Sequence, residues 1–211
     1  MKGITDEDIN QIDRILEFYK QKKIPVQYEL TLAYASSNLM RYLTEMGFGQ
    51  SDFHTTLYRE TSKMSGHLKS AISIGRLEKN EFDVFANIYA EGFNMPSFLK
   101  DGIAQNNKVL YDNKHWVFYL ASVEDQTVGI GVVFIKDKLA NLAAATTLPA
   151  MRNHGVHQAL INKRIKQAFL MDCDLIVGQA KFGSISQNNM ERCGMRIAYT
   201  KAIWVPKSSQ Y

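Results

Sequence analysis

The middle of the chain predicts three consecutive antiparallel strands followed by an amphipathic helix. Residues 115–123 and 127–136 read as strands, and the polar connection Glu124-Asp125-Gln126 between them is typical of a β-hairpin. Residues 139–148 form a third strand that is close to uniformly apolar. Residues 155–171 then place apolar side chains at helical spacing. A hairpin run that continues into a crossover helix predicts a mixed sheet with helices on both faces.

Further helices and strands are predicted before and after this run in the sequence. The predicted fold class is therefore α/β in the broad sense, with the mixed sheet of an α+β protein. On the helix of residues 155–171 we expect Phe169 to be buried. We expect the basic residues of the same helix to form a solvated face: Lys163, Arg164 and Lys166. The other helices are expected near residues 5–23, 36–46, 81–93, 98–110 and 186–193, and the other strands near 26–32, 53–59, 71–77, 174–179 and 197–205.

A polar stretch without periodicity divides the predicted elements into two groups. We interpret residues 61–70 as a linker, residues 1–60 as a small N-terminal α/β subdomain and residues 71–211 as the main domain.

Composition excludes several classes of protein. The chain has 45% hydrophobic and 22% charged residues, which is ordinary for a globular protein and argues against disorder or a coiled coil. Cys173 and Cys193 are too few for a disulfide framework. No apolar run approaches the roughly 20 residues needed to span a bilayer, and the polar N-terminus lacks a signal-peptide pattern. We therefore expect a cytoplasmic protein without a membrane partner.

Positive charge is concentrated near the C-terminus. The whole chain has a net charge of +4, but residues 150–211 carry nine Lys or Arg against three Asp or Glu, a net +6. This distribution predicts that an anionic ligand binds near the C-terminal segment. The segment has no motif or aromatic-interleaved basic face typical of nucleic-acid readers, so we expect no nucleic-acid partner.

The most informative stretch is Leu148–Leu160, where a strand ends, a turn follows and a helix begins. Such turns direct unpaired backbone N–H groups and the positive end of the helix at one point. Gly155 allows the backbone to approach a ligand closely, and Arg152 adds a charge that can bind a phosphate through two hydrogen bonds. The stretch has neither a P-loop nor a Rossmann pattern, but it suits a pyrophosphate.

This loop reads Arg152-x-x-Gly155-x-His157, and a second run at Gly183–Trp204 reads G-S-I-S-Q-N-N-M-E-R-C-G-M-R-I-A-Y-T-K-A-I-W. The first resembles the acyl-CoA loop [QR]-x-x-G-x-[GA] of the GNAT N-acetyltransferase superfamily, with His157 where a small residue is usual. The second resembles the terminal helix and strand of one bacterial branch of that superfamily. The resemblance covers roughly residues 71–206 and implies a mostly antiparallel twisted sheet.

The resemblance implies that acetyl-CoA or another acyl-CoA lies where the strand of residues 139–148 separates from the next strand. Backbone N–H groups of the loop would hold the pyrophosphate, and the end of the strand and the last helix would bind the pantetheine arm. The implied binding residues are Thr146, Thr147, Leu148, Arg152, Asn153, His154, Gly155, Val156, His157, Ser186 and Asn189. For Ser186 and Asn189, helix capping and surface exposure are equally open alternatives. No metal site is expected.

The catalytic residues are unassigned. Amine attack on a thioester needs a base for the ammonium, donors for the oxyanion and a proton for the thiolate. The tyrosine that usually serves as the acid in this superfamily is replaced by Met190, and residues 139–148 contain no acid. Weak candidates for proton transfer are Glu91, Tyr119 and Glu124, with a structural role or a water chain as alternatives.

The N-terminal 60 residues partly repeat the C-terminal segment. With a shift of 147 positions, Gly47 falls on Gly194 and Ser37 on Ser184. The subdomain is therefore interpreted as a degenerate half-GNAT-like extension, although chance is an alternative for so short a match. Acids at its first helix would repel a pyrophosphate, so we expect it to cover a sheet edge, shape the acceptor pocket or make a homodimer contact.

The predicted function is transfer of an acetyl group from acetyl-CoA to a primary amine of a small molecule or peptide. The alternative is a non-catalytic acyl-CoA sensor, which Met190 and the acid-free strand favour.

Overall fold

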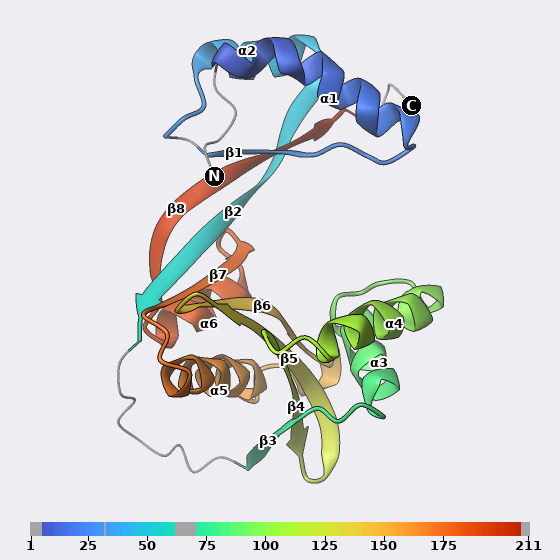
Figure 1. The fold of residues 1–211 in the computed structure, drawn as a ribbon, viewed down its shortest axis with the longest axis vertical. Helices are drawn as coiled ribbons and strands as arrows, with labels where there is room; N and C mark the ends of the chain where they lie inside the picture. Colours follow the sequence, from blue (N-terminus) through green and yellow to red (C-terminus); the bar gives the residue numbers. More distant parts are fainter. Residues whose placement is uncertain (1–5, 32, 62–70, 208–211) are drawn as a thin grey trace. The chain divides into compact units, whose positions relative to one another are not determined.

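A computed structural model describes residues 6–31, 33–61 and 71–207, which form two compact units (Figure 1). The first unit comprises residues 1–56, 180–187 and 197–211, and the second comprises residues 57–179 and 188–196. Among the described helices, none is long and apolar enough to cross a membrane. The division follows contacts rather than chain order, because strands and helices near the C-terminus contribute to both units.

The first unit packs two helices on one face of a small sheet. Its helices are α1 (Ile9–Gln21), preceded by the 3₁₀ turn η1 (Asp6–Asp8), and α2 (Ser37–Glu45), and its strands follow the order β1 (Tyr28–Thr31), β8 (Arg196–Pro206) and β2 (Phe48–Glu60). The Ser36 side chain caps α2 by accepting a hydrogen bond from the Leu39 N–H at 3.0 Å.

Strands in the second unit follow the order β7-β6-β5-β4-β3. Their bounds are β3 (Ile72–Arg76), β4 (Trp116–Val123), β5 (Gln126–Lys136), β6 (Leu139–Thr147) and β7 (Leu175–Lys181). The helices are α3 (Phe82–Gly92), α4 (Lys100–Tyr111) after the turn η2 (Ser97–Leu99), α5 (Val156–Leu170) after the turn η3 (Pro149–Met151), and α6 (Ile185–Arg192), which has residues in both units. The sheet is mixed and mostly antiparallel, as predicted.

Two-residue turns set the register of the antiparallel run β4-β5-β6. Glu124 and Asp125 have φ of 47° and 62°, and Asp137 and Lys138 have φ of 51° and 60°. Two successive positive φ values define type I′ turns, whose twist matches that of the flanking strands. The first connection is one residue shorter than the predicted one, because Gln126 already pairs with Val123.

A β-bulge interrupts β6 where its parallel pairing with β7 ends. Val132 pairs with Ala144 and Phe134 with Asn141, so two residues of β6 oppose the single residue Val133 of β5. On the other side, β6 pairs with β7 only as far as Leu142 opposite Gly178, although β6 continues to Thr147. The last residues of β6 therefore have a strand partner on one side only.

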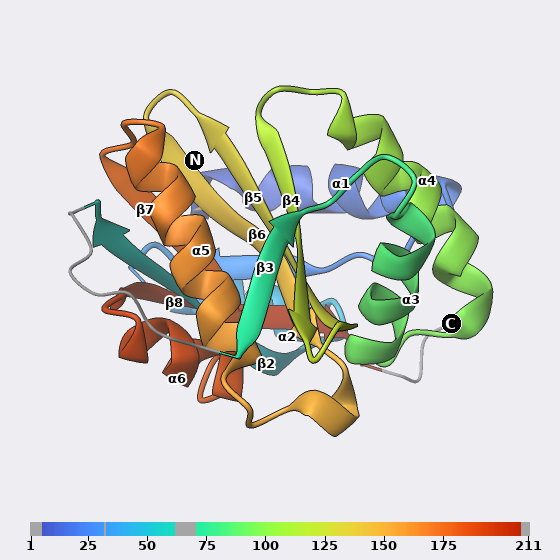
Figure 2. The ribbon, with the colours of Figure 1, turned by 90° about the horizontal axis from the view of Figure 1, so that it is seen from below.

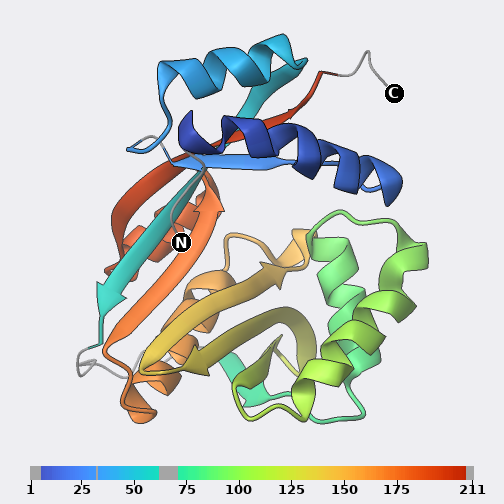
Figure 3. The same ribbon diagram turned by 45° about the horizontal axis from the view of Figure 1, so that its top comes forward.

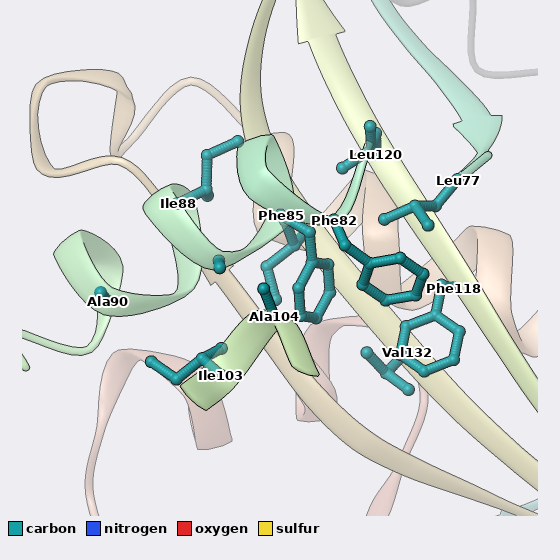
Figure 4. Packing of buried hydrophobic residues seen from close by; sticks show 12 residues of the cluster. Leu77, Phe82, Phe85, Ile88, Ala90, Ile103, Ala104, Phe118, Leu120 and Val132 are labelled. Carbon is teal, nitrogen blue, oxygen red and sulfur yellow. The ribbon is translucent and has the colours of Figure 1, made fainter. Parts of the chain in front are cut away.

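Helices cover both faces of these strands (Figures 2 and 3). Phe82, Phe85 and other side chains of α3 and α4 pack with Phe118, Leu120 and Val132 of β4 and β5 in one hydrophobic cluster (Figure 4). On the opposite face, α5 approaches β5 at Gly129 and Gly131. A Cβ on Gly129 would lie 2.9 Å from Val156 and 3.3 Å from the carbonyl oxygen of Thr146, so this contact requires glycine.

Two expectations for α5 are wrong. Phe169 is 42% exposed in the last turn of the helix, next to fully buried Ala168. Arg164, which we expected on the solvated face, is 1% exposed. It lies four residues after buried Leu160 and four before buried Ala168, so it belongs to the buried stripe.

Similar local geometry surrounds the two glycines that the predicted repeat aligns. Gly47 and Gly194 follow α2 and α6 with φ of 83° and 81°, and the next residues, Phe48 and Met195, are both buried. The half-GNAT-like repeat remains a prediction. The domain boundary also remains one, since residues 62–70 of the expected linker lie outside the described part of the chain.

Replacing Gly129 with alanine is expected to destabilise the protein by about 1–3 kcal/mol, because the new methyl group meets backbone as well as side chains. Gly75→Ala is the matched control, since a Cβ there has no atom within 4 Å. Urea denaturation of both variants measures the difference. Equal stability of the two variants would contradict the close packing of α5 on β5.

Candidate functional site

The turn between β6 and α5 places the free N-terminal backbone groups of a helix beside Arg152, as the prediction of an anion site requires. After β6 ends, η3 leads to Asn153 with φ of 67° and Gly155 with φ of 80°. Gly155 is the N-cap of the 15-residue helix α5, has no side chain to cap it, and no acid follows in the first turn. The first N–H groups of the helix, at Val156 and His157, have no partner within the helix. Together with the helix dipole, these groups fit a pyrophosphate.

Arg152 connects this turn to the end of α3. Its Nη2 donates a hydrogen bond to the Gly92 carbonyl oxygen at 2.9 Å. Gly92 itself packs on β6, because a Cβ there would lie 2.3 Å from Oγ1 of Thr146. The structure thus brings Arg152, Thr146 and the end of α3 together, with the guanidinium held beside the turn that begins α5.

The end of β6 presents backbone groups to its open side. The Leu148 N–H donates to the Val128 carbonyl oxygen at 2.9 Å, so the groups of Leu148 point to β5. Backbone groups alternate in direction along a strand, and therefore those of Ala145 and Thr147 point away from β5. Oγ1 of Thr147 is buried and has no hydrogen-bond partner among the described residues. This open edge fits an extended ligand that carries amides.

A hydrogen bond connects the His157 side chain to α6, and the imidazole is neutral at physiological pH. Its Nδ1 accepts a hydrogen bond from Nδ2 of Asn189 at 3.2 Å, while Oδ1 of Asn189 accepts one from Nη1 of Arg192 at 3.4 Å. Burial, with a smaller effect of the nearby Arg164 charge, lowers the pKa of His157 to about 4. The larger residue at the third position of the loop motif is accommodated by pairing with Asn189.

Other predicted site residues lie as follows. Leu148 is half-buried, and Asn153 and His154 are exposed in the turn. Ser186 belongs to the first unit and does not cap α6, because Oγ of Ser184 accepts the hydrogen bond from the Gln187 N–H at 3.2 Å. These positions leave the predicted binding roles as predictions.

The three candidates for proton transfer occupy different places. Glu91 is exposed in the last turn of α3, next to Gly92. Glu124 lies in the hairpin turn at the same end of the sheet as Leu148. Tyr119 is fully buried on the α5 face, where its hydroxyl donates to Oε1 of Gln167 at 2.9 Å. Burial raises the pKa of Tyr119. The structure does not bring these three side chains together.

Arg164 is the residue that sequence reasoning missed. Its Nη1 donates to the carbonyl oxygens of Val132 and Ala144 at 3.2 and 3.1 Å, and its Nε donates to that of Leu160 at 3.0 Å. The available signal was its position, four residues from apolar residues on both sides.

Met190 stands where the superfamily usually has its tyrosine acid. It is buried and packs on Gly178, where a Cβ would lie 3.3 Å from the Met190 Sδ. Within the described ranges, no group of three or more His, Cys, Asp or Glu could hold a metal ion.

Acidification should destabilise the protein through His157. Between about pH 6.5 and 4 the unfolded chain binds a proton at this residue and the folded chain does not, so stability falls as the pH falls. The full effect is about 3 kcal/mol. We expect His157→Gln to lose this part of the pH dependence and His154→Gln, at an exposed position, to keep it. Urea denaturation at a series of pH values tests this; parallel curves for His157→Gln and the wild type would refute it.

Comparisons with known proteins identify the fold. No family model and no curated protein matches the sequence. Among solved structures, a GCN5-related N-acetyltransferase from Sphaerobacter thermophilus matches with a TM-score of 0.75 and 12% identity, over 94% of this chain and 68% of that one. One from Kribbella flavida matches with a TM-score of 0.70 and 15% identity, over 95% and 76%. AAC(6')-Iy, in complex with the bisubstrate analogue CoA-S-monomethyl-acetylneamine, matches with a TM-score of 0.50 and 13% identity, over 58% and 88%. The chain has the fold of the GCN5-related N-acetyltransferases, the GNAT superfamily.

Proposed function

We propose that this protein is an acyltransferase that moves an acetyl group from acetyl-CoA to a primary amine. One observation carries the proposal. Strand β6 leaves its partner β7 at Leu142 and then leads directly into a helix start that has a left-handed glycine at its N-cap and Arg152 beside it. An open strand edge followed by an anion site matches a ligand with an amide-containing arm and a pyrophosphate.

The chain's residues divide the binding between them. The N–H groups at the start of α5 and the Arg152 guanidinium would hold the pyrophosphate. Backbone groups of Ala145 and Thr147 would pair with the arm. The Thr147 hydroxyl, which has no partner among the described residues, would accept or donate a further hydrogen bond. Asn189 would contribute its remaining N–H, since its amide is otherwise engaged with His157 and Arg192.

Bound acetyl-CoA supplies the acetyl group as a thioester. The amine nitrogen forms a bond to the carbonyl carbon, the carbon–sulfur bond breaks, one proton leaves the amine and one reaches the sulfur. The N–H groups on the open edge of β6 would donate to the acyl oxygen while it carries negative charge. Because these donors are held by the β5-β6 ladder, they need no rearrangement during the reaction.

The base and the acid are left open in this proposal. Glu91 is the candidate next to Gly92, which contacts both Arg152 and Thr146. Tyr119 and Glu124 are the other candidates, and a water chain is an alternative. The acceptor would be an amine of a small molecule or a peptide, and a cytoplasmic location and a homodimer belong to the same proposal. The CoA analogue in AAC(6')-Iy, a protein of similar fold, supports the use of CoA.

Isothermal titration with acetyl-CoA tests the binding site. Arg152→Glu should weaken binding by about 10- to 100-fold, because it replaces a charge-assisted hydrogen bond with repulsion. Lys166→Glu makes the same type of change at an exposed position of α5 and should bind like the wild type. Failure of the wild-type protein to bind at tens of micromolar, together with unchanged behaviour of Arg152→Glu, would refute the proposal.

A second candidate function is an acyl-CoA sensor without catalysis. Buried Met190, which cannot donate a proton, favours it. Measuring free-thiol release with acetyl-CoA and a panel of amines separates the two functions. Release above the uncatalysed rate supports the enzyme, whereas tight binding without release over the whole panel supports the sensor.

A further inference from the structure

Arg164 carries a buried charge that no acidic side chain balances in the part of the chain that the structure describes. Burial lowers its pKa to about 10, so it stays charged at neutral pH. None of the ion pairs among the described residues involves it, and its Nη2 has no hydrogen-bond partner among them. A buried charge without a counter-charge costs several kcal/mol, and an apolar side chain of similar volume would pack there at lower cost. A stabilising role alone does not explain this residue.

The guanidinium lies at the β6 bulge. It contacts the carbonyl oxygens of Val132 and Ala144, the first pair after the irregularity in the ladder. Gly131 lies beside it, since a Cβ there would be in ordinary contact with Nε of Arg164 at 3.4 Å. The arginine therefore reaches the one place in β6 where pairing with β7 has just ended.

The peptide that Arg164 contacts also faces the open edge. The C=O and N–H of one trans peptide point in opposite directions. The C=O of Ala144 belongs to the same peptide as the N–H of Ala145, and that N–H points away from β5. A charged donor on the carbonyl oxygen polarises the peptide and makes its N–H a stronger donor. Arg164 thus contacts the side of β6 that faces β5, and through the peptide it strengthens the N–H donor on the open side of the strand.

We propose that Arg164 is a positioning residue for acyl transfer, which fixes the bulge of β6 and strengthens the Ala145 N–H as a donor to the acyl oxygen. This inference rests on the proposed function and adds a residue on α5 to it. The arrangement would compensate for the lack of an acid in β6, since the negative charge that develops on the acyl oxygen would be stabilised by backbone and a buried cation.

Infrared difference spectroscopy of acetyl-CoA with a ¹³C-labelled thioester carbonyl tests the inference without a known acceptor. A stronger hydrogen bond to the acyl oxygen moves the carbonyl band to lower frequency. We expect the wild type to show this shift. Arg164→Lys should keep part of the shift, and Arg164→Gln and Arg164→Met should lose most of it. Lys166→Met, on the exposed side of α5, is the matched control and should keep the wild-type band.

Stability and affinity separate this role from a structural one. Arg164→Met should be as stable as the wild type or more so in urea denaturation, and should bind acetyl-CoA within about threefold of it. If Arg164→Met fails to fold, Arg164→Gln, which keeps a hydrogen-bond donor, takes its place. A wild-type band in either folded variant would overturn the inference while leaving the proposed function intact. No binding of acetyl-CoA by the wild type would overturn both.

With an active amine acceptor, the same variants should lose about 10-fold in kcat at unchanged KM for acetyl-CoA. This is less than the roughly 100-fold or greater loss that follows direct removal of an oxyanion donor, because Arg164 acts through the peptide. A rise in KM with unchanged kcat would instead assign the residue to ligand binding and contradict the positioning role.

Discussion

The candidate site depends on the end of β6, where the backbone no longer forms hydrogen bonds with β7. Backbone groups inside a sheet are almost always paired, and an unpaired edge in the middle of a chain needs a partner from elsewhere. In β6 the extra residue at the bulge ends the pairing with β7, while pairing with β5 holds the strand in place. Among the described residues, the end of β6 therefore has a strand partner on one side only, next to the N-terminus of α5.

Much of this fold could be predicted from local patterns. The β4-β5 hairpin follows from two apolar runs around a short polar turn, and α5 follows from its helical spacing. Their ends differ from prediction by one or two residues, which is the usual uncertainty of helix and strand boundaries. The strand-to-helix turn itself could also be predicted, and with it Arg152 and Gly155 as candidates for binding an anion.

The bulge and Arg164 could not be predicted in the same way. Ala143, Ala144 and Ala145 form a small apolar run in which nothing marks an extra residue, because a bulge depends on the register of the neighbouring strand. Arg164 stands between Lys163 and Lys166, a basic pattern that predicts a solvated face. Its burial is a tertiary effect, since the carbonyl oxygens of Val132 and Ala144 that its guanidinium contacts lie on two other elements of the chain.

The hydrogen bond between Arg152 and Gly92 bears on the entropy of ligand binding. A free arginine side chain loses up to about 2 kcal/mol of conformational entropy when it is fixed in one rotamer. Here the contact at 2.9 Å already restricts the side chain before any ligand arrives. Part of the ordering cost is thus incurred during folding, and an anion that meets Arg152 in this position encounters a preorganised donor.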